Sequence, residues 1–131
     1  MLSSVPADDV VIVADLEAGI GTLTRLEDGA VDVTLVVVEP TPRSMDVAER
    51  AVQVATEKGQ GQIIIVANKI ADDADLNHVT KVFVNHTIMS VPADQVVDRA
   101  DREGLSPLDV DPSAPAITAI ETIASTLIDP R

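Results

Sequence analysis

The sequence contains no cysteine, tryptophan or tyrosine, and it has a single phenylalanine. Without cysteine the chain can form no disulfide, thiolate metal site or thiol nucleophile, which agrees with a reducing cytoplasm. The core must therefore be aliphatic. We expect no metal site built from protein ligands alone, because Asp72 and Asp73 are better explained as helix caps than as ligands.

Basic residues are also scarce, with 9 Lys and Arg against 22 Asp and Glu and a net charge of −13. Nucleic acids and anionic membranes are bound chiefly through clustered Lys and Arg, so we expect neither as a partner. No apolar run approaches the roughly 20 residues that span a bilayer, and the amino terminus does not resemble a leader. We therefore expect a cytoplasmic protein.

The chain is long enough for one domain with a real core, because 46% of its 131 residues are hydrophobic. We expect residues 1–131 to form this single domain. Continuous β-branched runs predict strands buried on both faces. These runs cover residues 10–14, 33–38 and 63–67, with a weaker fourth over 86–91.

Segments with helical periodicity follow the strands. Thr41 as a cap and Pro42 in the first turn predict a helix that ends at Gly59. Three further helices are expected: one behind Asp72 and Asp73, one between Pro92 and Gly104, and one from about Ser113 to before Pro130. This alternation predicts an α/β fold with a parallel sheet of about four strands and helices on both faces.

Four blocks of residues stand at or near the ends of the expected strands. They are Asp15-Leu16-Glu17-Ala18-Gly19-Ile20, then Glu39-Pro40-Thr41-Pro42-Arg43-Ser44, then Asn68-Lys69, and last Val91-Pro92-Ala93-Asp94. In order and spacing these blocks resemble the MinD/ParA/nitrogenase-iron-protein branch of the P-loop ATPases, the SIMIBI class. Within that branch they most resemble the CooC-type accessory ATPases that insert nickel into carbon monoxide dehydrogenase.

The resemblance implies ATP and Mg²⁺ as cofactors. It would place Asp15 behind the Mg²⁺ and its waters, and the Gly19 amide near the γ-phosphate, as the catalytic residues. It would also give Asn68 a hydrogen bond to the adenine edge. The base pocket would be closed by Pro92, Ala93 and Asp94. Plainer readings are open for each: a turn former for Asp15, a turn for Asn68, and a helix cap for Asp94.

The P-loop itself is missing from the sequence, because no glycine is followed by lysine. The chain therefore resembles the carboxyl-terminal half of such an ATPase, a partial P-loop NTPase fold without the P-loop strand and its Walker A motif. We expect no ATP hydrolysis by the chain alone. The paired-cysteine metal site of the nickel-insertion proteins is missing as well.

The resemblance implies a fragment or degenerate member of a metallochaperone-type switch ATPase that acts on a client metalloenzyme. Two other functions are left open. One is a non-catalytic protein-interaction domain, a pseudo-ATPase. The other is a receiver-like signalling domain, which is disfavoured because the paired acids Asp8 and Asp9 precede the first expected strand instead of following it.

In the family that the sequence resembles, the P-loop strand lies between the strands that correspond to residues 10–14 and 33–38. Without it, these two strands either pair directly or leave an edge for another chain, because open apolar edges promote aggregation. We therefore expect a homo-oligomer or a partner chain that completes the sheet.

Overall fold

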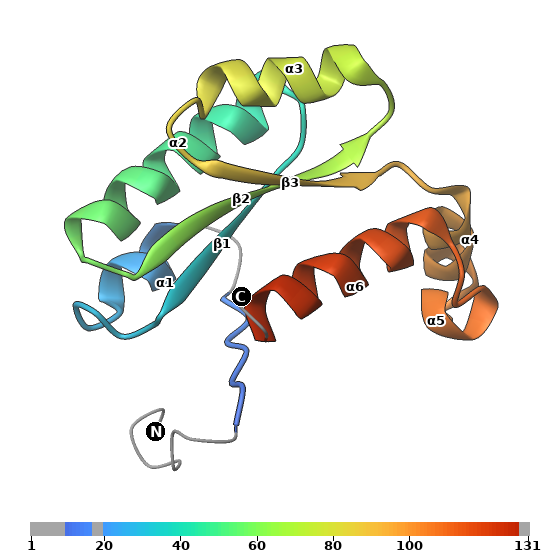
Figure 1. Cartoon of the computed structure of the whole chain (residues 1–131), viewed down its shortest axis with the longest axis horizontal. Coiled ribbons are helices and arrows are strands. Elements are labelled where there is room, and N and C mark those ends of the chain that lie inside the picture. The colour runs from blue at the N-terminus through green and yellow to red at the C-terminus, as the bar shows by residue number, and fades with distance from the viewer. Residues whose placement is uncertain (1–9, 17–19, 129–131) are drawn as a thin grey trace.

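The computed structural model describes residues 10–16 and 20–128. Three parallel strands, β1 (Val33–Val38), β2 (Gln62–Ile70) and β3 (Thr87–Pro92), form a sheet in the order β1-β2-β3. Helices cover both faces of this sheet (Figure 1). The predicted α/β architecture is thus confirmed, with three described strands instead of about four.

Two long helices, α2 (Pro42–Glu57) and α3 (Asp73–Val82), lie on one face of the sheet. On the other face α6 (Pro115–Ile128) packs against β3. The chain reaches α6 through α4 (Gln95–Glu103) and the short α5 (Pro107–Val110), which contact each other. A short helix, α1 (Ile20–Arg25), contacts α2.

The core is aliphatic except for Phe83, the single aromatic residue, which is buried in it, and the sheet divides this core in two. Val36 and Val38 of β1 point to the face covered by α2 and α3, where they pack in one cluster with Ile65 of β2. Val66 and Val91 point to the opposite face, where they meet α6. This alternation of sides along each strand is the period of two that an extended backbone imposes.

The predicted helix starts are confirmed by their caps. Thr41 Oγ1 accepts a hydrogen bond from the Ser44 N–H at 3.3 Å, and Pro42 occupies the first turn of α2. Asp72 Oδ1 accepts from the Asp75 N–H at 2.9 Å at the start of α3. Gly104, with φ 68°, ends α4 in the left-handed conformation that glycine adopts without a Cβ clash.

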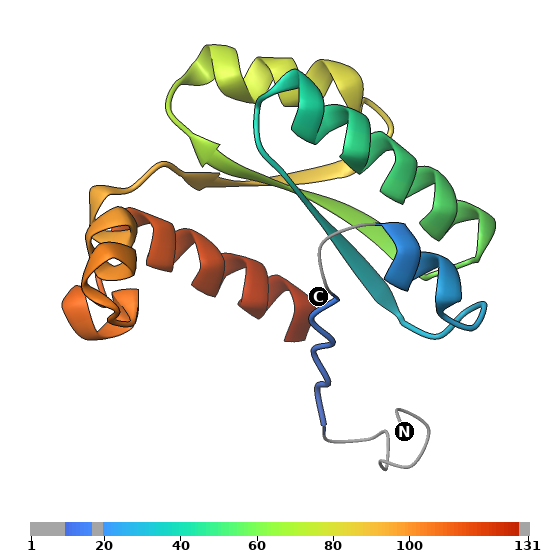
Figure 2. The same ribbon diagram turned by 180° about the vertical axis from the view of Figure 1, so that it is seen from behind.

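The strand expected over residues 10–14 is wrong. Residues 10–16 form neither strand nor helix, and the side chains of Val10, Val11, Ile12 and Val13 are 53%, 63%, 46% and 85% exposed. In Figure 2 this segment runs away from the sheet. An apolar run becomes a strand only beside another strand with free N–H and C=O groups, and none of the described residues pairs with it.

Two smaller features also differ from the sequence prediction. The short helices α1 and α5 were not expected from the sequence. Both have six residues or fewer, too few for a helical period to be visible. None of the helices in the described part of the chain combines the length and apolarity of a membrane-crossing segment.

Candidate functional site

The three parallel strands bring their carboxyl ends to one edge of the sheet. Ala67 of β2 is opposite Ser90 of β3, and Ile70 is opposite Pro92. Asn68 therefore lies beside the end of β3, next to the start of the Pro92, Ala93 and Asp94 segment. The four residues that the resemblance assigns to the base pocket converge at this edge. The first and the last of them lie more than twenty positions apart in the sequence. Ligands of open α/β sheets bind at this end of the strands.

A β-bulge shapes the edge. Two residues of β2, Asn68 and Lys69, stand opposite the single Val91 of β3, and Lys69 has a positive φ of 55°. The ladder resumes where the Ala93 N–H donates to the Ile70 C=O at 2.9 Å. Bulges turn individual side chains out of the regular alternation and are common beside functional sites. The sequence alone indicated a turn after a buried strand as the alternative here, whereas the residues lie inside β2.

The side chain of Asn68 is half-buried at this edge. Among the described residues, its carboxamide forms no hydrogen bond. A carboxamide offers two N–H donors and one C=O acceptor. This set matches the Watson–Crick or Hoogsteen edge of adenine, where an amino donor stands beside a ring-nitrogen acceptor. Asn68 is therefore chemically suited to the role that the family resemblance implies.

Both carboxylate oxygens of Asp94 accept hydrogen bonds from the protein backbone. Its Oδ1 accepts a hydrogen bond from the Val96 N–H at 2.9 Å and caps α4. Its Oδ2 accepts from the Ala116 N–H, also at 2.9 Å, in the first turn of α6. The carboxylate thus joins the amino ends of two helices. The plainer interpretation of Asp94 as a helix cap is thus confirmed.

An ion pair that sequence reasoning missed lies at the same edge. Lys69 Nζ is 2.9 Å from Glu39 Oε1, so the pair links the carboxyl ends of β2 and β1. The hydrogen bond and the charge of Glu39 raise the pKa of Lys69 above its ordinary value of 10.5. Both side chains are exposed, and such pairs contribute little to stability. No sequence signal identifies this pair, because the two residues are thirty positions apart.

The structure does not test the two predicted catalytic residues. Asp15 is exposed in the segment of residues 10–16, and Gly19 lies outside the described residues. Their proposed contacts with Mg²⁺ and the γ-phosphate therefore stay predictions.

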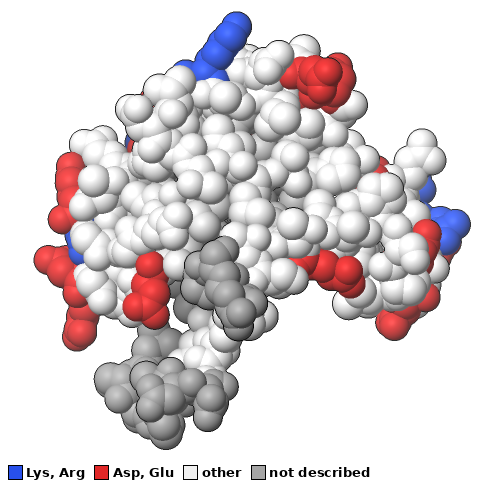
Figure 3. Space-filling view, in the orientation of Figure 1, with Lys and Arg blue, Asp and Glu red and all other residues white. Residues whose placement is uncertain are grey.

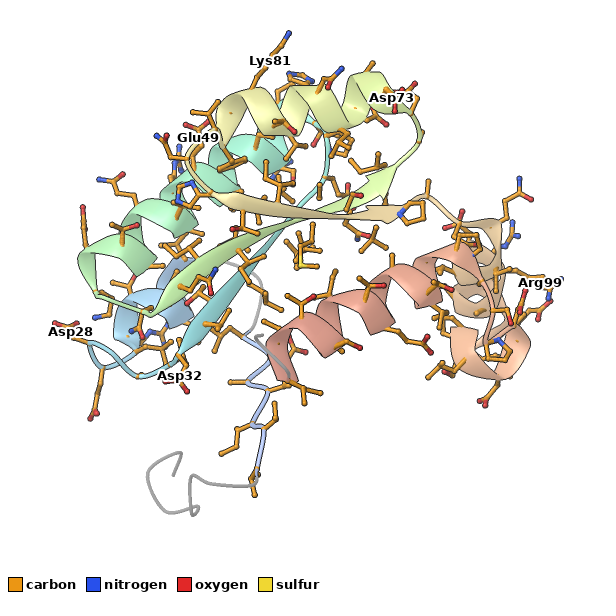
Figure 4. The ribbon with its side chains drawn as sticks, in the orientation of Figure 1. Asp28, Asp32, Glu49, Asp73, Lys81 and Arg99 are labelled. Carbon is orange, nitrogen blue, oxygen red and sulfur yellow. The ribbon has the colours of Figure 1, made fainter. Side chains whose placement is uncertain are left out.

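Charged side chains are distributed around the rim of the molecule. On the face in Figure 3, acidic groups lie at the periphery, and the centre is uncharged. Figure 4 shows Glu49, Asp73, Lys81 and Arg99 pointing outward from their helices.

A surface hollow of about 380 Å³ lies at the opposite, amino-terminal end of the strands. It is lined by Ala55, Thr56, Gly59, Gly61, Gln62, Ile63, Asn85, His86 and Thr87. Position in the fold, more than concavity, therefore identifies the carboxyl edge as the candidate site, since α/β sheets bind ligands at that end.

Known proteins share sequence with most of this chain. The chain is 32% identical over 103 residues to the carbon monoxide dehydrogenase accessory protein CooC of Rhodospirillum rubrum, a match that covers 78% of this chain and 39% of the relative. It is 29% identical over 109 residues to an uncharacterized ATP-binding protein of Methanocaldococcus jannaschii, covering 81% of this chain and 42% of the relative. The chain therefore spans about two-fifths of the length of these curated relatives.

A solved structure shows the same fold. The MinD cell division protein of Aquifex aeolicus superposes with a TM-score of 0.65 and 18% identity, over 86% of this chain and 48% of that one. No family model matches the sequence. The sequence matches and the shared fold point to the same branch of the nucleotide-binding proteins.

Proposed function

Because the chain is a partial MinD/CooC-like P-loop ATPase, we propose that it is the base-binding part of a nucleotide-dependent switch. The switch would serve as a metallochaperone-type maturation factor for a client metalloenzyme. ATP with Mg²⁺ is the ligand that the kinship favours. The observation that carries the proposal is the convergence of Asn68 with Pro92, Ala93 and Asp94 at the carboxyl edge of the sheet.

The residues at the edge fit an adenine base. Asn68 would donate to and accept from the base edge, and Pro92 and Ala93 would contact it from the side of β3. Asp94 would keep those two residues in position through its two hydrogen bonds to helix amides, at 2.9 Å each. Burial of a base against apolar groups with one bidentate amide is a common way to achieve orientation and selectivity.

The phosphates and the metal ion fit less completely. Carboxylate oxygens are the ligand type that Mg²⁺ and its waters prefer, so Asp15 is suitable chemically. The sequence has no Gly-Lys-Ser/Thr loop to surround the phosphates, and Lys69 is paired with Glu39. Bound ATP would supply the free energy for switching between two conformations. Since most nucleotide affinity comes from phosphate contacts, we propose that this chain alone binds nucleotide weakly and does not hydrolyse it.

Isothermal titration with adenosine and with MgATP tests the base site. We expect similar, weak affinities for both ligands, because the base provides the contacts that this chain can make. Asn68→Ala should raise the Kd about 5- to 10-fold, equivalent to a lost hydrogen bond of about 1 kcal/mol. The matched control is Asn85→Ala, at the opposite end of the strands in the hollow beside His86, and it should leave the Kd unchanged.

Three results would contradict the proposal. Equal losses of affinity in Asn68→Ala and Asn85→Ala would place the base elsewhere. Submicromolar binding of MgATP, or hydrolysis above the background rate, would show that the chain binds the phosphates without another polypeptide segment. Absence of any adenosine binding would favour the second candidate, a pseudo-ATPase interaction domain. That candidate draws support from the exposed apolar side chains of Leu35 and Val37 on β1.

A further inference from the structure

The bulge at the end of β2 moves one side chain out of the core. Ile65 and Ala67 pack on the face that α2 and α3 cover, and so does Ile70. Because side chains alternate between the two faces of a regular strand, an uninterrupted β2 would place Lys69 on this covered face and Ile70 on the other. The extra residue of the bulge returns Ile70 to the covered face. It leaves Asn68 and Lys69 together at the edge of the sheet.

Lys69 has a backbone conformation that normally belongs to glycine. Its φ is 55°, and it is the one residue other than glycine with a positive φ in the described part of the chain. This conformation strains a residue that has a Cβ, whereas glycine adopts it freely. An exposed ion pair such as that with Glu39 contributes less to stability than this strain removes. Stability therefore does not explain the lysine, and strained residues of this kind cluster at functional sites.

The Lys69 side chain is attached to the start of α2 through Glu39. Lys69 Nζ lies 2.9 Å from Glu39 Oε1. The backbone of Glu39 is itself held by two residues at the start of α2. Its N–H donates a hydrogen bond to Ser44 Oγ at 2.9 Å, and its C=O accepts one from the Thr41 N–H at 2.8 Å. A continuous series of contacts thus joins α2 to the bulge of β2.

Asn68, the neighbour of Lys69, has no such attachment of its own. Its carboxamide forms no hydrogen bond with the described residues, so its orientation depends on the backbone at the bulge. That backbone is fixed on one side by the Ala93 N–H, which donates to the Ile70 C=O at 2.9 Å. It is fixed on the other side by the pair of Lys69 with Glu39. Of these two contacts, the ion pair is the one that a side-chain substitution can remove.

We propose that Lys69 is a positioning residue: through its ion pair with Glu39 it fixes the Asn68 carboxamide in the orientation in which that group binds the base. Lys69 itself does not contact the ligand. This role rests on the proposed base site, because Lys69 acts through Asn68. It also implies a property of the chain without ligand, a single side-chain rotamer of Asn68, which is measured independently of binding.

Titration with adenosine tests this role, because adenosine is uncharged and the loss of a lysine has no direct Coulombic effect on it. Lys69→Gln and Glu39→Gln should each raise the adenosine Kd about 3- to 5-fold, which is part of the loss expected for Asn68→Ala. Lys69→Arg keeps a charged donor for Glu39 and should retain the native Kd. The double variant Asn68→Ala/Lys69→Gln should bind as Asn68→Ala does, because Lys69 acts only through Asn68.

A control and two further measurements separate positioning from a general effect on stability. The matched control, Lys58→Gln, breaks the 3.1 Å pair with Asp28, away from the carboxyl edge, and should leave the adenosine Kd unchanged. Lys69→Gly relieves the backbone strain, so its free energy of unfolding in urea should be no lower than that of the native chain, although adenosine binding weakens. In the chain without ligand, NMR couplings across the χ1 bond of Asn68 should indicate one rotamer. In Lys69→Gln and Lys69→Gly the same couplings should indicate averaging over several rotamers.

Each contrary result has a distinct meaning. Native adenosine affinity in Lys69→Gln, or a further loss in the double variant, would overturn the positioning role. A loss of affinity confined to MgATP would assign Lys69 to the phosphates instead. If adenosine does not bind, or if Asn68→Ala binds it as the native chain does, the proposed base site fails. The NMR couplings still decide in that case whether Lys69 fixes Asn68, because a single Asn68 rotamer in both Lys69 variants would show that it does not.

Discussion

Asp94 provides a sharp test of how the candidate site is held together. Its two carboxylate oxygens each accept one backbone N–H at 2.9 Å, from Val96 at the start of α4 and from Ala116 at the start of α6. Replacing Asp94 by Ala removes a helix cap worth about 1 kcal/mol. It also leaves the partly buried Ala116 N–H without a partner, at about 1–3 kcal/mol. We expect the free energy of unfolding to fall by about 2–4 kcal/mol in total.

Two matched variants separate these contributions. Asp72→Ala removes a cap of the same kind from α3, where the carboxylate serves only one helix, and should cost about 1 kcal/mol. Asp94→Asn keeps one side-chain acceptor but replaces the other by an N–H donor. It can therefore satisfy only one of the two amides, and its stability should lie between those of Asp94→Ala and the native chain.

Urea unfolding followed by far-UV circular dichroism measures these changes, since the chain has no tryptophan or tyrosine for a fluorescence signal. The reasoning is refuted if Asp94→Ala costs no more than Asp72→Ala, or if Asp94→Asn is as stable as the native chain. Either result would mean that the second oxygen of Asp94 does not stabilise α6. That oxygen would then be free for a ligand.

Two further predictions follow from the backbone and from the ion pair at the site. Gly61→Ala should lower the free energy of unfolding by well over the roughly 1–2 kcal/mol of left-handed strain, because a Cβ at φ 67° would overlap the Asp32 carbonyl. The control Gly59→Ala, at φ 60° with nothing within 4 Å of the added Cβ, should cost the strain alone. Equal losses of stability for the two variants in the same urea assay would contradict this reasoning. Because the pair with Glu39 raises the pKa of Lys69 above 10.5, its stabilising effect is complete below pH 10.5 and is lost as the pH rises through the higher folded value. In Glu39→Gln the pKa of Lys69, followed by NMR titration, should return toward 10.5, and an unchanged pKa would show that the pair does not form in solution.

Much of the fold follows from local sequence patterns. The continuous β-branched runs located β1 at residues 33–38, and the Thr41-Pro42 and Asp72 caps located the starts of α2 and α3. These signals work because capping groups and strand-forming runs act over a few neighbouring residues. The resemblance placed Asn68 and Pro92 at strand ends, and the β2–β3 register brings them to one edge.

Other features depend on contacts between distant residues. Strand β2 covers Gln62–Ile70, beyond the expected residues 63–67. It continues past the bulge at Asn68 and Lys69 because the Ala93 N–H donates a hydrogen bond to the Ile70 C=O. The second hydrogen bond of Asp94 reaches Ala116, which is twenty-two positions away. Neither contact has a local signal, so sequence patterns predicted a turn and a single cap.

The sequence by itself determined which segments can be buried, where helices begin, and that an aliphatic α/β domain without a phosphate loop results. Residues 10–14 mark the limit of that information. Their pattern correctly indicates a segment that is apolar enough for a sheet, but a strand exists only where a neighbour offers a matching row of N–H and C=O groups. Only the tertiary structure decided that, within residues 10–16 and 20–128, β1 pairs with β2 alone. Hydrophobic pattern is a property of the segment, whereas pairing is a property of two segments and of the space between them.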